Sequence, residues 1–281
     1  MICFYHGDLD GIASAAILNY YRYKQGLLSS EDKYIKVNYN DNLYLDKIKN
    51  EHVYILDFSL NSIEDFTLLT NKINVTWIDH HKTSIEKYKD FRWVLGKRQD
   101  GIAACELTWQ YLFENQEIPN IIKLIGDYDV WTFKYGDKTN HLQLGMQIRD
   151  TEPTNLVFWD KFLDNNYPYS YKYLDEIINE GMIIDKYRQQ DYKKTVDEYK
   201  FYRRWEGYNC VVCNRIAPSM LFDSVSEESY DVMIMYIFDG INYHISLRTK
   251  INEIDVSKIA QKYGGGGHKG ASGFICQQLP F

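Results

Sequence analysis

The ten residues ICFYHGDLDG, from Ile2 to Gly11, decide the fold of this chain. The apolar run Ile2–Tyr5 indicates a strand, a polar turn follows from His6 to Gly11, and a helix is expected to begin near Ile12. A strand that is apolar throughout is typical of a parallel sheet, where both faces are buried. The order strand, polar turn and helix therefore predicts the start of an α/β domain with a parallel sheet.

Strands and helices continue to alternate over the first 130 residues. The next predicted strands are Tyr34–Tyr39, Val53–Phe58 and Val75–Ile78. Between the last two, Ser62 is a typical N-cap of a helix that carries Ile63, Phe66, Leu69 and Ile73 on one face. Further helices are predicted over Ile102–Glu114, over Asn120–Ile125, and from Thr154 to about Tyr202 with a break near Asn165–Pro168.

The C-terminal part is rich in strands. Val232–Phe238 and Tyr243–Leu247 flank Asp239-Gly240, a hairpin signal, and Asp255 is expected to cap a helix that ends at Tyr263. Cys210–Cys213 and Gly273–Cys276 are the other predicted strands. We therefore predict an N-terminal α/β domain over residues 1–170, a helical connector over 171–204 and a smaller mixed α/β domain over 205–281, with the boundary near Arg203–Tyr208.

The composition is that of a globular protein and excludes several classes. The 281 residues are 45% hydrophobic and 25% charged, which is enough apolar material for a packed core. No apolar run reaches the length of a membrane span and no signal-peptide pattern is present, so a cytoplasmic protein without a membrane span is expected. The net charge of −7 gives no basic footprint for long duplex nucleic acid.

The five cysteines are odd in number and scattered, which fits free thiols in a reducing compartment. Cys210 and Cys213 form a CxxC, but the two valines between them are typical of a strand and no second Cys/His pair follows nearby. We expect buried thiols there, not a zinc or redox site.

Acidic and histidine residues follow three of the predicted strands. His6, Asp8 and Asp10 follow the first strand, Asp57 closes Val53–Phe58, and the triplet Asp79-His80-His81 follows Val75–Ile78. The carboxyl ends of the strands of an α/β sheet form the edge where ligands bind. Carboxylates and imidazoles without thiolates favour Mn²⁺ or Mg²⁺ over structural zinc.

Each of these residues also has an ordinary interpretation. An Asp after a strand is commonly a turn residue or an N-cap, and a lone His is usually a surface or core residue. The combination favours a site, because a His and two Asp in one short turn and a second His pair all fall at the same predicted edge of the sheet.

Five segments, in this order, resemble the motifs of the DHH phosphoesterase family with its C-terminal DHH-associated domain. They are FYHGDLDG, ILDFS, IDHHK, IGDYD and GGGGHKGASGF. The triplet from Asp79 to His81 is similar to the motif that names the family, and the segment around His268 to that of the associated domain. The resemblance spans nearly the whole chain, and it implies an α/β hydrolase that acts with two divalent cations.

The resemblance implies a role for each residue of the site. One cation would be bound by His6, Asp8 and Asp57, and the other by Asp10, His80 and Asp127, with Asp57 bridging the two. Asp129 is the alternate to Asp127 in the segment Gly126–Asp129. Asp79 would orient His80, and His81 would be catalytic, on the leaving group or on the developing charge. Mn²⁺ is expected, with Mg²⁺ or Co²⁺ as alternatives.

The glycine-rich tract and one arginine are expected to bind the substrate. Gly265, Gly266 and Gly267, with His268, could present backbone N–H groups to a phosphate. A glycine after a helix is usually only a C-cap, but four exceed what a cap needs. Arg248 resembles the arginine that precedes this tract in the family, and it could contact a phosphate with two hydrogen bonds. Its ordinary interpretation is a surface residue at a strand end.

The short two-domain length is most similar to the nanoRNase type of this family. The expected function is hydrolysis of short oligonucleotides or nucleotides, including 3′-phosphoadenosine 5′-phosphate. The alternatives are a pyrophosphatase or exopolyphosphatase, a RecJ-type exonuclease on longer strands, and a non-catalytic nucleotide-binding module. The six implied ligands favour an enzyme over a binding module. The oligomeric state is left open, with a homodimer as one option.

Overall fold

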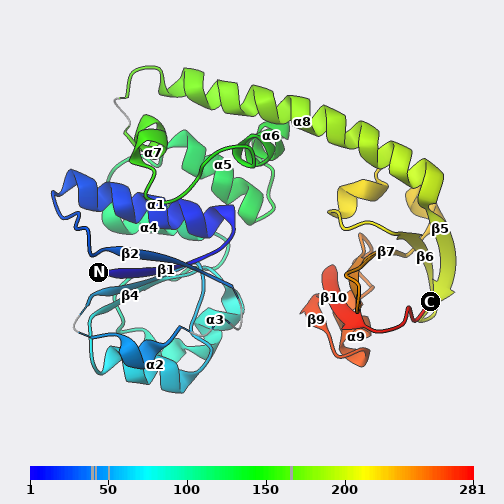
Figure 1. Cartoon of the computed structure of the whole chain (residues 1–281), viewed down its shortest axis with the longest axis horizontal. Coiled ribbons are helices and arrows are strands. Elements are labelled where there is room, and N and C mark those ends of the chain that lie inside the picture. Colours follow the sequence, from blue (N-terminus) through cyan, green and yellow to red (C-terminus); the bar gives the residue numbers. More distant parts are fainter. Residues whose placement is uncertain (39–40, 42, 50, 165–166) are drawn as a thin grey trace. The chain divides into compact units, whose positions relative to one another are not determined.

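The computed structural model describes residues 1–38, 41, 43–49, 51–164 and 167–281. These residues divide into two compact units, Met1–Asp185 and Lys186–Phe281, and each contains one sheet (Figure 1). The division falls inside a long helix, α8 (Ser170–Tyr199). The predicted class is confirmed: a parallel sheet, a helical middle and a C-terminal mixed sheet. Tyr39, at the end of a predicted strand, and Asn165 and Asn166, in the predicted break, lie outside the described residues.

The sheet of the first unit has four parallel strands in the order β2-β1-β3-β4. Ile2 lies opposite both Lys33 and Val53, and Val53 lies opposite Val75, so the four strands start level and end level. Residues that follow β1, β3 and β4 therefore meet at one edge. The strands are β1 (Ile2–His6), β2 (Lys33–Val37), β3 (Val53–Leu56) and β4 (Val75–Ile78).

Helices cover both faces of this sheet, so its strands are apolar on both sides (Figure 1). On one face, Phe66 and Leu69 of α2 pack on Phe4 and Trp77. On the other, α1 and α4 pack on the sheet and on each other, which explains the alanine-rich sequence of α1. The helices of this unit are α1 (Leu9–Lys24), α2 (Ile63–Thr70), α3 (Lys82–Lys87), α4 (Ala104–Leu112), α5 (Asn120–Asp129), α6 (Asp137–Met146) and α7 (Leu156–Leu163).

Two helix boundaries differ from the prediction and both bear on the site. Helix α1 begins at Leu9, three residues before Ile12, because the Asp8 side chain accepts the Gly11 N–H at 3.0 Å and caps the helix. Helix α5 continues to Asp129 and does not end at Ile125. Gly126 lies inside this helix, at a position where a Cβ would stand only 2.6 Å from the Glu106 carboxylate.

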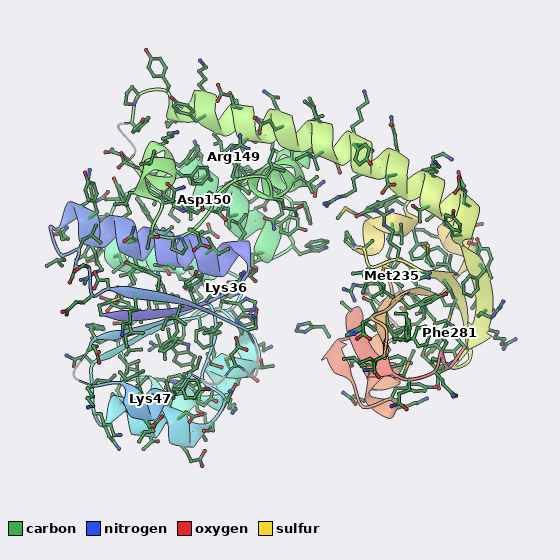
Figure 2. The ribbon with its side chains drawn as sticks, in the orientation of Figure 1. Lys36, Lys47, Arg149, Asp150, Met235 and Phe281 are labelled. Carbon is green, nitrogen blue, oxygen red and sulfur yellow. The ribbon has the colours of Figure 1, made fainter. Side chains whose placement is uncertain are left out.

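The second unit is a six-stranded mixed sheet in the order β5-β6-β7-β8-β10-β9. Helix α9 (Val256–Lys262), capped by Asp255, covers one face, and the other packs on residues such as Tyr192 and Val196 of α8. Met235 lies in the apolar core that contains Tyr192 and Val196. Phe281 packs against the apolar core on the other face, which contains residues of α9 (Figure 2). The strands are β5 (Phe201–Trp205), β6 (Tyr208–Cys213), β7 (Val232–Phe238), β8 (Tyr243–Arg248), β9 (Gly266–His268) and β10 (Ala271–Cys276).

Strand β5 was not predicted. It starts at Phe201, so the second sheet begins before residue 205, and the predicted boundary Arg203–Tyr208 falls inside the β5–β6 hairpin. All five cysteines are free thiols, four of them buried and Cys276 partly exposed, as expected. Within the described residues, no helix combines the length and the apolar character that a membrane span needs.

Candidate metal centre

Asp57 is the central residue of the predicted site. It follows β3 and is 1% exposed, and it adopts φ 64°, a left-handed conformation that few residues other than glycine tolerate. Neither of its carboxylate oxygens has a hydrogen-bond partner in the described part of the chain. Burial, followed by repulsion from Asp8 and Asp129, raises its pKa well above the ordinary value, against the opposing effect of His6. A buried carboxylate without a hydrogen bond is stabilised by a positive charge beside it, from a histidine or a metal ion.

His6 and Asp8 lie on one side of Asp57. His6 Nδ1 is 2.8 Å from Asp8 Oδ2 and 3.5 Å from Asp57 Oδ2. Its interactions with Asp57 and then Asp8 raise the pKa of His6 to about 10, whereas His6 and the Gly11 N–H lower the pKa of Asp8 to about 2 against the effect of burial. Asp8 is thus both the N-cap of α1 and a member of the site. The turn needs Gly11, because a Cβ there would stand 2.2 Å from the His6 carbonyl oxygen.

Asp10, His80 and Asp129 lie on the other side. His80 Nε2 is 3.3 Å from Asp57 Oδ1, 3.2 Å from Asp129 Oδ2 and 3.8 Å from Asp10 Oδ2. Burial raises the pKa of both Asp10 and Asp129, and repulsion between carboxylates adds to the rise. The backbone N–H groups of Ala104 and Cys105 donate to Asp10 at 2.8 and 2.7 Å, so the start of α4 fixes this carboxylate. Sequence reasoning missed that contact, which spans 94 residues of chain.

Asp129, and not Asp127, joins the site. The choice of Asp127 assumed that it follows a helix, but α5 continues through both residues. Positions two apart on a helix point to different sides. Asp127 faces away and accepts hydrogen bonds from the Thr132 and Thr139 hydroxyls and from the N–H groups of Lys134 and Tyr135. These donors lower the pKa of Asp127 although its burial opposes them.

The expected partner of Asp79 is also corrected. Its carboxylate does not contact His80; Oδ1 lies 2.7 Å from His81 Nδ1 and accepts the His81 N–H at 3.1 Å. Burial lowers the pKa of His81, but the hydrogen bond and charge of Asp79 outweigh it and raise that pKa to about 9. In the metal-free chain the His81 ring is therefore protonated at neutral pH, with its ring centroid 4.6 Å from that of His80.

The donor set fits divalent cations. Three groups offer ligand atoms that all lie within 4.8 Å of one another: His6 with Asp8 and Asp57, Asp10 with His80 and Asp129, and Asp57 with His80 and His81. Asp57 belongs to both the first and the third group. One of its oxygens lies near His6 and the other near His80. Oxygen and imidazole donors of this kind suit Mn²⁺ or Mg²⁺.

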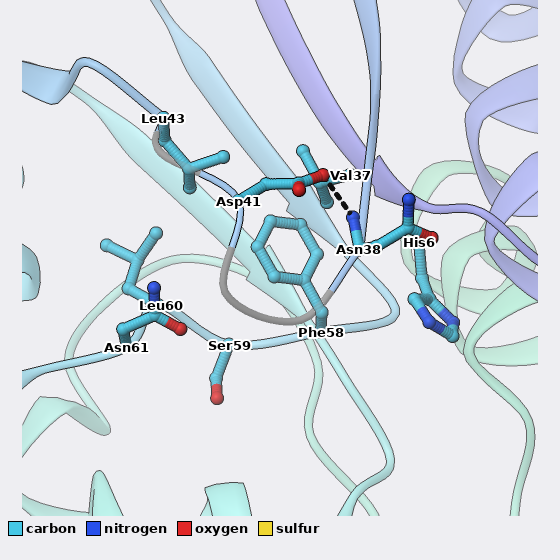
Figure 3. Close-up of a pocket in the computed structure, with 9 residues that line it drawn as sticks. All are labelled: His6, Val37, Asn38, Asp41, Leu43, Phe58, Ser59, Leu60 and Asn61. Carbon is cyan, nitrogen blue, oxygen red and sulfur yellow. Dashed lines mark hydrogen bonds between the residues drawn. The ribbon is translucent and has the colours of Figure 1, made fainter. Parts of the chain in front are cut away.

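A small pocket adjoins the His6 side of the centre (Figure 3). Phe58 and Leu60, from the segment after β3, form its apolar wall opposite Asn38 and Asp41. Asp41 Oδ2 accepts the Asn38 N–H at 2.8 Å, so these two residues are joined at the rim of the pocket. The pocket thus lies at the same carboxyl-end edge of the sheet as the metal ligands.

The predicted substrate-binding residues lie in the second unit. Arg248 and His268 both pair with Ala271, so the three residues form one row across β8, β10 and β9 and share one face of the sheet. Arg248 is half-buried and donates to the Leu247 carbonyl at 2.9 Å, whereas His268 is exposed. Gly265 and Gly267 are needed for packing, since a Cβ at either would stand within 2.6 Å of a backbone oxygen. A Cβ at Gly266, as at Gly264, would face open space.

Comparisons identify several known proteins to which this chain is similar. Residues 1–128 match the model of the DHH family, N-terminal domain. Uncharacterized protein R106 of Acanthamoeba polyphaga mimivirus is 27% identical over 97% of this chain and 66% of its own length, so the chain spans slightly less than two thirds of it. Oligoribonuclease NrnB of Bacillus subtilis is 25% identical over 95% of this chain and 71% of its own.

A solved structure shows the same fold. PggH from Vibrio cholerae, a pGpG-specific phosphodiesterase, aligns with a TM-score of 0.54 at 12% identity and covers 98% of this chain and 93% of its own.

Proposed function

We propose that this chain, whose residues 1–128 match the model of the DHH family, N-terminal domain, is a phosphoesterase that hydrolyses short oligonucleotides with two divalent cations. One observation carries the proposal: Asp57 is buried between two groups of candidate metal-binding side chains, and among the described residues neither of its oxygens accepts a hydrogen bond. A shared carboxylate in that position is what a two-metal centre requires.

We assign the ligands by these groups. His6, Asp8 and Asp57 would bind one cation, and Asp10, His80 and Asp129 the other, with Asp57 shared. Bound cations of this kind activate a water and stabilise charge on a phosphate. Asp79 orients His81 through the contact with Nδ1 and favours its protonated form, so His81 would stabilise negative charge or protonate the leaving oxygen. Mn²⁺ is the cation we favour, because the donors are carboxylates and imidazoles only.

The substrate class rests on the relatives and on charge. NrnB is named an oligoribonuclease and PggH a pGpG-specific phosphodiesterase. A net charge of −7 offers no general attraction for a long polyanion, so binding must come from a few local contacts. We assign one such contact to Arg248 and His268, whose row in the second sheet could bind one phosphate.

Catalytic efficiency is expected to be highest on RNA of two to five nucleotides and to fall on a strand several times longer. Few phosphates are neutralised, so the slope of log affinity against log salt should also be shallow. The measurement is kcat/KM with Mn²⁺ on labelled oligomers of graded length, beside pyrophosphate and 3′-phosphoadenosine 5′-phosphate. The assignment to short oligonucleotides would be rejected if efficiency rose with strand length and the salt slope were steep. A preference for pyrophosphate would reject it as well. Activity that survives exhaustive EDTA treatment would reject the metal assignment.

The thermal stabilisation by Mn²⁺ is expected to grow as pH rises from 6 to 8. Without metal, Asp10, Asp57 and Asp129 have pKa values that are higher in the folded than in the unfolded chain. Their contribution to folding stability is therefore complete below about pH 4 and is lost as the pH rises through their pKa values in the folded chain. His6 and His81, raised to about 10 and about 9, lose their contribution above about pH 6.5. The signs agree, so the metal-free protein weakens across this window, while cations replace the protons.

Melting temperatures in EDTA and in saturating Mn²⁺, at pH 6, 7 and 8, test this. The two curves should diverge by several degrees, since about 1 kcal/mol shifts the melting temperature of a chain this size by roughly 2–4 °C. Glu117→Gln is the matched control, because Glu117 is an exposed carboxylate that forms an ion pair with Lys123 at 2.8 Å and belongs to none of the candidate metal-binding groups, so the divergence should be unchanged. A constant difference across pH would contradict the prediction.

A further inference from the structure

A loop of aromatic side chains follows directly on Asp129. Trp131 is 57% exposed although it is one of the largest apolar side chains of the chain. Its ring packs nearly perpendicular to that of Phe133, at a centroid distance of 4.7 Å and an angle of 84°, and it meets the Tyr128 ring at 5.3 Å and 71°. The neighbouring rings thus fix the orientation of the indole while much of it remains open to solvent.

The backbone of this loop is held in an unfavourable conformation. Trp131 and Phe133 have φ 58° and 49°, in the left-handed region that bulky residues rarely adopt. Asp127 maintains this conformation. Its Oδ1 accepts hydrogen bonds from the Thr132 hydroxyl at 2.5 Å and from the Lys134 N–H at 3.0 Å, and its backbone carbonyl accepts the Thr132 N–H at 3.1 Å. Such strain persists only where the surroundings enforce it, and it is concentrated at functional sites.

The loop also stands next to the metal centre. Asp129 Oδ2 is 3.2 Å from His80 Nε2. Trp131 is two residues beyond Asp129, so the Cα atoms of Asp129 and Trp131 are at most about 7 Å apart. The exposed indole is thus carried by the segment that directly follows a candidate metal ligand. Lys134, exposed on the same loop, adds a cation that suits a phosphate and disfavours a cationic ligand.

We propose that Trp131 stacks on a nucleobase of the substrate bound at the metal centre, and that Asp127 is the positioning residue that holds the loop for this contact. The inference rests on the proposed function and adds a residue that recognises the base instead of the phosphate. Stacking on an aromatic ring tolerates every base, because each base has a π-face, so Trp131 gives affinity without sequence preference.

Binding of a dinucleotide with a non-hydrolysable methylenephosphonate linkage, compared with its abasic analogue, tests this in the full chain with Mn²⁺. Trp131→Ala is expected to weaken binding of the base-bearing ligand about tenfold or more and to leave the abasic ligand unchanged. Trp131→Phe should retain most of the affinity. The matched control is Trp93→Ala: Trp93 is 65% exposed, and it precedes Leu95, which pairs beside Thr76 near the amino end of β4, away from the site.

Equal losses on the two ligands, unchanged affinity in Trp131→Ala, or a wild type that binds both ligands alike would overturn the inference. Hydrolysis is measured separately on the natural dinucleotide. A wild type that binds as expected but shows no turnover would remove the proposed function and leave the stacking contact standing. If the wild type hydrolysed the dinucleotide and Trp131→Ala bound both ligands as the wild type does, the proposed function would stand and the stacking contact would be removed.

Discussion

Asp57→Asn is expected to lower kcat/KM by at least about 10³-fold while the metal-free protein becomes no less stable at pH 8. Losing a residue that only supports a metal ligand costs about 10- to 100-fold, so losing a ligand shared by both cations should cost more. Stability should hold because the amide removes a buried charge, and because Asn tolerates the φ of 64° better than most residues.

The measurement pairs turnover on a dinucleotide with denaturant unfolding in EDTA. Asp57→Ala is the companion variant: it also removes the ligand but is strained at this φ, so it should lose both activity and stability. If folded Asp57→Asn retained near-normal turnover, Asp57 would not bridge two cations. An activity loss matched by a large loss of stability would instead point to a structural carboxylate.

The strand-end residues could be predicted because they depend on local pattern alone. Apolar runs identified β1, β3 and β4, and the parallel sheet then required that the residues after them meet, as Asp57 and His80 do at 3.3 Å. The fold followed from the same pattern. Asp8 was predicted as a ligand, with an N-cap as its ordinary interpretation. In the structure Oδ1 caps α1 while Oδ2 lies 2.8 Å from His6 Nδ1, so the cap leaves the second oxygen facing the site.

The errors arose where a local signal was overridden by a tertiary contact. The helix was predicted to end at Ile125, but α5 continues to Asp129, and Asp127 is held by the residues that follow the helix. Strand β5 was missed because Arg203 and Arg204 lie in it, and charged residues are common on an edge strand. The aromatic loop after Asp129 carried a usable signal in its sequence, VWTFKY at residues 130–135, which the prediction did not use.

The two carboxylates of α5 are expected to separate cleanly on mutation. Asp129→Asn should lower kcat/KM by at least about 10²-fold with stability in EDTA unchanged or improved, because it removes an inferred ligand whose pKa is raised by burial. Asp127→Asn should instead reduce the free energy of unfolding by about 2–4 kcal/mol, because an amide NH₂ would face N–H and hydroxyl donors that now find a carboxylate.

The contrast depends on two residues of the same type, two positions apart on one helix, so composition and local helix propensity are matched. Metal content distinguishes them further: Asp129→Asn should bind Mn²⁺ more weakly, whereas Asp127→Asn, where folded, should bind it normally and lose affinity mainly for base-bearing substrates through its loop. Activity loss with normal stability in Asp127→Asn, together with a near-wild-type Asp129→Asn, would restore Asp127 as the ligand. That result would require α5 to end before Asp127 in the metal-bound protein, since the helix as it stands directs only Asp129 toward His80.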